Sequence, residues 1–469
     1  MCFLFIASGV LLIVSVLVPF LNWLIWFAFV PALVLIRRLR LIPSFVTGTG
    51  LGLFYFSAYL YSLVYYEVRI FAIVLLLAAP LIGVFLSLTR AIWQKTRNHF
   101  VRLIAPPLAW SAVSFLYSFT PIGIIGDQIS LSQAPHFPLI AYVTGVSGIA
   151  VLIVLGNSVL YHWFYLRKGV FRSGLIPLLL ITTLGVTQAP QPPKQESLKV
   201  ALIQHNFPIE TQWRYLNRND LFTTYEEAIK HYGPLVDLVV FPQYGLPKDV
   251  LRESEWLVTL AQQNRTSILL GTYLPKESGG NFVEGERTNS ALLFTPDGHV
   301  QEYQAVTAPP FREIGQVLGT EHNPLVIDEI PIGVMLCYED VDPRQGKKWV
   351  EHEAQLLFAL SNPGHFLKTR LPNYHLLHDQ IRAIETGRFL IRVSPNGFSA
   401  VIDPNGRIIT QSRLDERRVL VADVYPISTK TLFARVGSIL PGMSALVVLA
   451  LVIRSYVRDR IRRRARKKR

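Results

Sequence analysis

The stretch Pro331-Ile-Gly-Val-Met-Leu-Cys337-Tyr338-Glu339-Asp340 is the most informative part of this sequence. Its apolar residues have the length and composition of a buried strand, and the run ends on a cysteine followed by polar residues. In open α/β sheets, ligands bind at the carboxyl ends of the strands. Cys337 is therefore a candidate nucleophile, and the alternative is an ordinary buried thiol, a role that cysteine often fills.

Around this stretch, short aliphatic runs alternate with helical patterns, which predicts a layered α/β domain with a large, covered sheet. The expected helices cover 217–231, 250–263 and 373–387. The expected strands cover 199–204, 236–241, 267–273, 289–295, 332–337, 355–360, 388–393, 398–402 and 419–424.

The rest of the chain is apolar, and 51% of all residues are hydrophobic while only 17% are charged, which favours the membrane class. The first apolar run lacks a basic leader and a small-residue cleavage site, so we expect it to be retained. Eight runs are long enough to be candidate spans. They cover 3–20, 22–36, 44–65, 70–88, 103–120, 138–160, 174–189 and 434–453.

The formal net charge of +14 is concentrated in short segments beside these runs, at 37–40, 90–102, 167–172 and 454–469. Basic residues collect in cytoplasmic loops, so this pattern places the amino terminus and all four segments in the cytoplasm. It also excludes a nucleic-acid-binding surface as the reason for the charge. An odd number of spans then precedes the α/β domain, which predicts that this domain lies on the outer, periplasmic side.

The domain organisation follows from these boundaries. We predict a seven-span region at 1–190, a proline-rich linker at 191–198 and the α/β domain at 199–428. The eighth span at 434–453 and a basic cytoplasmic tail at 454–469 complete the chain.

The segment around Cys337 resembles the nucleophile region of the apolipoprotein N-acyltransferases, the membrane-embedded members of the nitrilase (carbon-nitrogen hydrolase) superfamily. The resemblance extends over nearly the whole chain, including the arrangement of seven spans, domain and final span. Further segments that resemble this family are Val200–Gln204 followed by Asn206, Pro208 and Trp213, Asp237–Pro242, Pro310–Glu313, Ser361-Asn362, Arg382–Arg388, Asn396–Ala400, Ser132-Gln133 and Ala141–Gly148.

This resemblance implies a nitrilase-like αββα sandwich and a reaction that moves an acyl chain from a phospholipid to the amino-terminal cysteine of a lipoprotein. The family's reaction proceeds through a thioester on the enzyme's cysteine, with a glutamate as proton acceptor and a lysine that stabilises the oxyanion. By motif position Cys337 is the nucleophile, Gln243 stands at the glutamate's place and Ala305 at the lysine's place. A glutamine cannot accept the thiol proton at neutral pH.

Other site positions also follow from the resemblance. Glu313 matches a second glutamate of the family's site, and Tyr338 and Glu339 match the residues beside the nucleophile. His365, which follows a strand end, is a candidate substitute base because of its pKa. The apolar Phe311 and Phe366 flank these segments and could contact acyl chains or serve ordinary packing.

We expect no metal and no cofactor, because the two cysteines, Cys2 and Cys337, form no metal-ligand spacing with histidines. His375 and His378 lie three residues apart on an expected helix, which we interpret as a solvated face rather than a metal site.

Two hypotheses remain open. The first is an active acyltransferase of the bacterial inner membrane that uses Cys337 with altered helpers, such as Glu313, Glu339 or His365. The second is a pseudoenzyme that binds phospholipid, lipoprotein or a partner protein without turnover. A transporter is disfavoured because the spans carry no charged pair.

Overall fold

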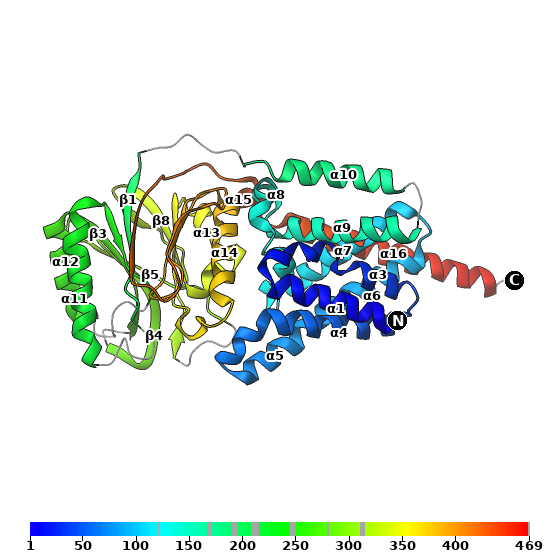
Figure 1. Cartoon of the computed structure of the whole chain (residues 1–469), viewed down its shortest axis with the longest axis horizontal. Coiled ribbons are helices and arrows are strands. Elements are labelled where there is room, and N and C mark those ends of the chain that lie inside the picture. Colours follow the sequence, from blue (N-terminus) through cyan, green and yellow to red (C-terminus); the bar gives the residue numbers. More distant parts are fainter. Residues whose placement is uncertain are drawn as a thin grey trace. The chain divides into compact units, whose positions relative to one another are not determined.

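The computed structural model describes residues 1–120, 122–166, 170–189, 196–207, 215–243, 250–278, 281–309 and 315–467. The chain folds as two compact units. We call Met1–Thr187 with Ser438–Arg469 the helical unit, and Gln188–Gly437 the α/β unit (Figure 1). Most of the predicted linker, at 190–195, lies outside the described residues, as do Pro208 and Trp213.

The helical unit is built of apolar helices. They are α1 (Cys2–Leu17), α2 (Ile25–Ala28), α3 (Val30–Ile36), α4 (Leu41–Leu60), α5 (Val68–Ala78), α6 (Pro80–Lys95), α7 (His99–Tyr117), α8 (Pro138–Thr144), α9 (Val146–Leu166), α10 (Val170–Gly185) and α16 (Ile439–Lys467).

Five helical segments within the described residues have the length and composition to cross a membrane. These segments are Pro19–Ile36, Leu41–Tyr65, Val68–Lys95, His99–Tyr117 and Val146–Tyr165. Three of the eight predicted spans correspond to shorter apolar helices, namely Cys2–Leu17, Leu175–Gly185 and Ile439–Arg454.

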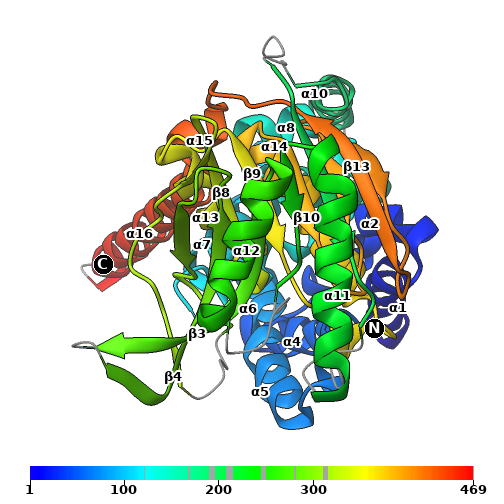
Figure 2. The same ribbon diagram turned by 90° about the vertical axis from the view of Figure 1, so that its left-hand side faces the viewer.

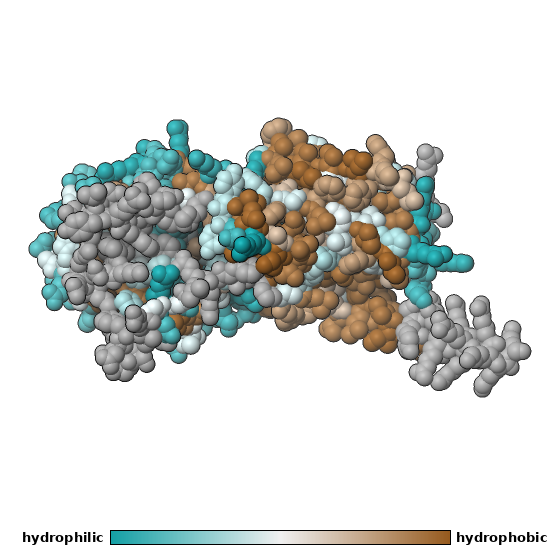
Figure 3. Space-filling view, turned by 90° about the horizontal axis from the view of Figure 1, so that it is seen from below, coloured by the Kyte–Doolittle hydropathy of each residue, from teal (hydrophilic) through white to brown (hydrophobic). Residues whose placement is uncertain are grey.

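Large apolar side chains cover the surface of the helical unit (Figure 3). Phe3, Phe20 and Ile42 are each more than three-quarters exposed. A water-soluble monomer rarely exposes an apolar surface of this extent, whereas lipid tails would cover it. The chain is therefore a multi-pass membrane protein.

Two helix boundaries differ from the sequence-based expectation because glycines interrupt the apolar runs. The expected span at 138–160 is divided at Gly145, which has a φ of 69° and separates α8 from α9. Gly437, also with a φ of 69°, separates α15 (Leu432–Val436) from α16. Glycine adopts this left-handed conformation without the steric cost that a side chain brings.

The α/β unit contains two sheets. The first has the order β13-β1-β2-β3-β4-β5, with β6 paired to β4, and the second has the order β12-β11-β10-β9-β8-β7. The strands are β1 (Leu198–Gln204), β2 (Leu238–Val240), β3 (Ser267–Ser278), β4 (Asn281–Phe294), β5 (Val300–Gln304), β6 (Gln316–Val317), β7 (Leu325–Ile327), β8 (Ile330–Leu336), β9 (Leu356–Leu360), β10 (Leu390–Val393), β11 (Ala400–Ile402), β12 (Ile408–Gln411) and β13 (Arg418–Val424).

The two sheets and their helices form the αββα sandwich that the family resemblance implies. Side chains alternate along β1: Val200 and Leu202 belong to the core shared with the second sheet, and Ala201 and Ile203 pack against α11 (Tyr215–Tyr232) and α12 (Val250–Asn264). Figure 2 shows these two helices in front of the first sheet. The second sheet is covered by α13 (Pro343–Glu351) and α14 (Leu371–Thr386).

The expectation of one large sheet was therefore wrong. Strands that are buried on both faces read as continuous apolar runs, and such runs do not reveal where one sheet stops and the next begins. The expected pattern also omitted β5, β6, β7 and β12, which are short and partly exposed.

Parallel pairing brings several strand ends to the same edge of each sheet. β1, β2 and β3 are mutually parallel, as are β8, β9 and β10. The carboxyl end of β2 precedes Gln243, that of β8 precedes Cys337, and that of β9 precedes Asn362. The topology thus gathers the predicted site residues where α/β folds bind ligands.

Candidate active site

Cys337 occupies a strained turn. It directly follows β8, begins the 3₁₀ helix η6 (Cys337–Asp340) and has a φ of 54°. Non-glycine residues seldom adopt this conformation, and such strain is concentrated at functional sites. A sharp turn after a strand presents a side chain at the sheet's end; residue Cys337 as a whole is partly exposed, while its sulfur is buried.

The surroundings of the Cys337 sulfur favour the neutral thiol. Burial and the neighbouring Asp340 carboxylate raise the pKa of Cys337 to about 12. Arg392 and the backbone N–H groups of Tyr338 and Asn362 act in the opposite direction, toward the thiolate, but they do not outweigh burial. The pKa of Tyr338 is also raised to about 12, by burial and by Asp342.

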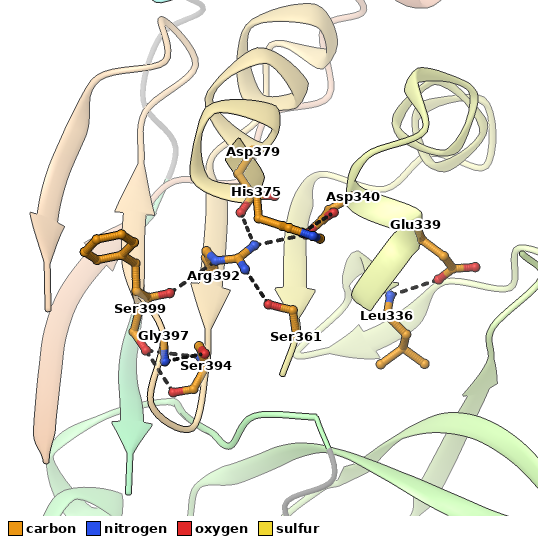
Figure 4. Close-up of polar contacts among 11 residues, drawn as sticks. Leu336, Glu339, Asp340, Ser361, His375, Asp379, Arg392, Ser394, Gly397 and Ser399 are labelled. Carbon is orange, nitrogen blue, oxygen red and sulfur yellow. Dashed lines mark hydrogen bonds and ion pairs between the residues drawn. The ribbon is translucent and has the colours of Figure 1, made fainter. Parts of the chain in front are cut away.

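Hydrogen bonds of Glu339 connect the Cys337 turn to the segment after β5. Its fully buried carboxylate accepts hydrogen bonds from the Tyr303 hydroxyl at 2.9 and 3.0 Å and from the backbone N–H groups of Val306 at 2.9 Å and Thr307 at 3.2 Å. It also accepts one from Leu336 N at 2.9 Å (Figure 4). These donors occupy the carboxylate's acceptor sites, so Glu339 positions the turn rather than presenting a free base. Burial raises its pKa to about 7.

Gln243 and Ala305 lie on either side of Asn289. Gln243 is fully buried, and its Nε2 donates to Asn289 Oδ1 at 3.1 Å. The backbone N–H of Ala305 donates to the backbone oxygen of the same Asn289 at 2.8 Å. Gly271 permits the close approach of Gln243, because a Cβ at this position would lie 2.8 Å from the Gln243 Cα.

The three positions of the predicted triad are thus connected through hydrogen bonds. Asn289 joins Gln243 to Ala305, and residues on both sides of Ala305 bind Glu339, two residues after Cys337. The side chains at these two positions are a neutral amide, at Gln243, and a methyl group, at Ala305. The Gln243 Oε1 is buried and has no hydrogen-bond partner within the described part of the chain.

A buried charge cluster lies behind the Cys337 turn, and Arg392 is at its centre (Figure 4). Its Nη1 donates to Asp340 Oδ2 at 2.9 Å and to Asp379 Oδ2 at 2.6 Å, and its Nη2 donates to Ser361 Oγ at 2.5 Å. His375 Nδ1 lies 3.0 Å from Asp340 Oδ1. The cluster therefore ties η6, β9, β10 and α14 together beside the cysteine.

The two carboxyl groups of this cluster are held in different states. Burial alone would raise the pKa of Asp340, but His375 and Arg392 keep it below its usual value. Burial raises the pKa of Asp379 to about 7, although Arg392 opposes this shift. The single positive charge of the guanidinium thus faces two carboxyl groups. As the pH falls, Asp379 takes up a proton before Asp340 does.

The solvated-face interpretation of His375 and His378 was wrong. His378 is buried and its pKa falls to about 3 because of that burial, while His375 contacts Asp340. Both face the charge cluster, which supplies polar partners in the interior. No group of three or more potential metal ligands is found within the described residues.

Another polar connection joins two segments that carry the family resemblance. Gln204 Oε1, at the end of β1, accepts hydrogen bonds from Ser399 Oγ at 2.8 Å and Ser412 Oγ at 2.7 Å. Ser399 Oγ also accepts from Ser394 N, and Ser394 Oγ accepts from Gly397 N (Figure 4). These contacts fix the loop after β10 against the end of β1.

Several predicted site residues cannot be placed. Phe311 and Glu313 lie outside the described residues, as does the side chain of His365. Phe366 is half-buried in the 3₁₀ helix η7 (Gly364–Phe366) that follows the Asn362 segment.

The sequence analysis missed Asn289, Tyr303, Asp379 and Arg392. A usable signal existed for Arg392, since an arginine inside the apolar run Leu390-Ile-Arg-Val393 must find buried partners. No such signal marks Asn289 or Tyr303.

Comparison with known proteins agrees with this geometry. Residues 199–431 match the family model of carbon-nitrogen hydrolases. A protein from Geobacter metallireducens named apolipoprotein N-acyltransferase is 26% identical, over 96% of this chain and 94% of its own length. A protein of the same name from Nitrosomonas europaea is also 26% identical, over 87% of each chain.

Among solved structures, a carbon-nitrogen hydrolase from Helicobacter pylori G27 is 16% identical, with a TM-score of 0.41 over 49% of this chain and 89% of that one. Nit3 of Saccharomyces cerevisiae, a nitrilase-superfamily member, is 21% identical, with a TM-score of 0.40 over 50% and 93%. The matches to named relatives extend over both units, and the carbon-nitrogen hydrolase model covers the αββα sandwich. The chain is similar to proteins named apolipoprotein N-acyltransferase over nearly its whole length and carries a carbon-nitrogen hydrolase domain at residues 199–431.

Proposed function

We propose that this protein is a degenerate acyltransferase of the bacterial inner membrane, which binds phospholipid or lipoprotein beside Cys337 and does not transfer acyl chains. Its α/β unit faces the periplasm, where the lipoprotein amino terminus is available. The observation that carries the proposal is Gln243, whose buried amide is bonded to Asn289 where the reaction needs a proton acceptor.

The state of the thiol supports this proposal. Burial raises the pKa of Cys337 to about 12, so the neutral thiol predominates at neutral pH. The thiolate is the attacking species, and the loss of one oxyanion donor costs a further factor of about 100 to 1000 in rate. Ala305 offers no side-chain donor, so both steps of the family's reaction lack a helper.

The pairing of His375 with Asp340 favours a second candidate, an active acyltransferase with a different base. An aspartate that accepts from Nδ1–H leaves Nε2 as the proton acceptor, the arrangement used by histidine bases. In this candidate the ring takes the Cys337 proton, the sulfur forms a thioester with the acyl carbonyl, and the ester C–O bond breaks. The proton then passes to the lysophospholipid oxygen.

Intact-protein mass spectrometry after incubation with phospholipid separates the two candidates. The comparison uses the full-length protein, Cys337→Ala, and the restored double variant Gln243→Glu with Ala305→Lys, all with Cys2→Ser to remove the other thiol. The degenerate site predicts an acyl adduct on the restored variant alone. An adduct on the wild type that is absent from Cys337→Ala and released by neutral hydroxylamine would overturn the proposal.

If the wild type does carry an adduct, His375→Gln identifies its base. Loss of the adduct in His375→Gln, together with its retention in Asp379→Asn, would support the second candidate. Retention in both would leave the base among residues outside the charge cluster.

A further inference from the structure

A cluster of basic and aromatic side chains lies at one end of the helical unit, away from any residue used above. Here residues 37–40, the end of α6, the start of α7 and the end of α9 meet. Arg90 Nε donates to the Leu39 carbonyl at 2.7 Å, and Arg102 Nη2 donates to the Trp93 carbonyl at 3.1 Å. We call Arg37, Arg90 and Arg102 the arginine cluster.

Aromatic rings pack against one another beside the arginine cluster. Trp93 stacks on Tyr161 with ring centroids 5.0 Å apart, and His162 meets both rings edge-on. Tyr161 and His162 are buried, and the positive charges of Arg37, Arg90 and Arg102 all act on the Tyr161 hydroxyl. The three guanidinium groups therefore converge on one tyrosine.

Negative charge is scarce around the arginine cluster. The sequence of the helical unit contains three acidic residues, Glu67, Asp127 and Asp459. Glu67 caps α5 by accepting from the backbone N–H of Arg69, and no ion pair of Arg37, Arg90 or Arg102 is found among the side chains that the structure describes. Arg90 and Arg102 are only partly exposed and lie close enough to repel each other.

An unused donor accompanies this excess of charge, because Arg102 Nε is buried and has no hydrogen-bond partner within the described residues. Ordinary cytoplasmic arginines beside membrane spans extend separately into water and need no common partner. Arg37 is exposed, but Arg90 and Arg102 are partly withdrawn from water beside the buried Tyr161, where an anion would neutralise their shared charge.

From this arrangement we propose that Arg37, Arg90 and Arg102 form a binding site for the phosphate of an acidic phospholipid in the leaflet on the side of the amino terminus. Guanidinium groups match phosphate oxygens in pairs, and basic pockets between membrane helices bind acidic headgroups. The neighbouring Ile42 and Phe100 are largely exposed and apolar, which favours a lipid over free phosphate. The proposal is independent of Cys337 chemistry.

Native mass spectrometry of the detergent-purified full-length protein tests the site. The protein is incubated with phosphatidylglycerol, cardiolipin or phosphatidylcholine, and the bound lipid is counted. We expect acidic lipids to be retained at least about tenfold better than phosphatidylcholine, and the double variant Arg90→Gln with Arg102→Gln to lose this preference. Equal retention of all lipids by the wild type would overturn the proposal.

The matched control is Arg38→Gln with Arg40→Gln, which removes the same charge from exposed neighbouring positions. If this control loses the preference as completely as the cluster variant, general surface charge is responsible and the site is refuted. Arg102→Lys keeps the charge but loses the paired donors, so it should bind acidic lipid measurably more weakly while its lipid-free melting temperature stays near that of the wild type.

Inorganic phosphate distinguishes the two sources of the anion. A lipid site predicts that phosphatidylglycerol raises the melting temperature of the wild type but not of the double variant, and that millimolar phosphate has little effect. If phosphate alone produces the full shift and displaces the lipid, the site binds a free anion and the lipid proposal fails.

Discussion

Arg392 in the α/β unit and Arg102 in the helical unit are both withdrawn from full solvent exposure, but their surroundings are opposite. Arg392 is fully buried, with two carboxylates and a hydroxyl on its donors. Arg102 has only a backbone carbonyl, and its Nε is unpartnered in the part of the chain that the structure describes.

This difference separates two uses of a guanidinium. A buried charge that is paired on all sides fixes the elements around it, and its removal leaves the partners uncompensated. A charge that lacks a counter-ion contributes little to the fold and is available to a ligand. The comparison therefore predicts large losses of stability around Arg392 and small ones around Arg102.

Arg392→Met should give the largest effect. It leaves Asp340 and Asp379 buried without their cation, so we expect the unfolding free energy to fall by about 3–5 kcal/mol. Thermal unfolding of the detergent-purified protein measures the change. Lys230→Met is the control, because it removes one partner of an exposed i,i+4 pair and should cost about 0.5 kcal/mol or less.

Asp340→Asn and Asp379→Asn should differ from each other in size. Asp340, whose pKa is lowered, is the better-stabilised anion, so its removal should cost about 1–3 kcal/mol near pH 8, and Asp379→Asn about 1 kcal/mol or less. Equal losses of unfolding free energy in the two variants would show that the charge cluster stabilises both carboxylates to the same extent.

The Asp379 variant should also change the dependence of stability on pH. The pKa of Asp379 is raised to about 7 in the fold, so the folded state holds this proton more tightly than the unfolded chain. The resulting stabilisation of the fold is complete below the usual pKa of an aspartate and is lost as the pH rises toward 7. The wild type should therefore lose up to about 1.4 kcal/mol per pH unit over this range, and Asp379→Asn should show a shallower slope. A residual slope of the same sign is expected from Glu339, whose pKa is also raised.

Ser361→Ala should have a smaller effect. It removes the hydroxyl that accepts from Arg392 Nη2, and a hydrogen bond to a charged donor contributes about 1.5–3 kcal/mol. We expect the lower end of that range, since the two carboxylates remain. Thr259→Ala, on an exposed helix position, is the matched control and should lie within about 0.5 kcal/mol of the wild type.

Strand ends and motif positions predict that Gln243, Ala305 and Cys337 share one site, and their roles in that site stay a prediction. Asn289 and the segment beside Ala305 connect Gln243 to the Cys337 turn. The sequence was not sufficient to predict the charge cluster. His375, His378, Asp379 and Arg382 share one helical face, and polar residues at that spacing are usually solvated. Here His375 contacts Asp340 and Asp379 accepts from Arg392, a long-range partnership that helical periodicity cannot express.

Arg102→Gln should give the smallest change in the absence of lipid, and it tests the comparison most sharply. It removes a repulsive charge near Arg90 at the cost of one hydrogen bond to Trp93, so the unfolding free energy should stay within about 1 kcal/mol of the wild type. High salt should stabilise the wild type more than the variant, because salt screens a repulsion that the variant lacks. A loss as large as that of Arg392→Met, measured in lipid-free detergent, would mean that Arg102 is a structural charge with a partner of its own.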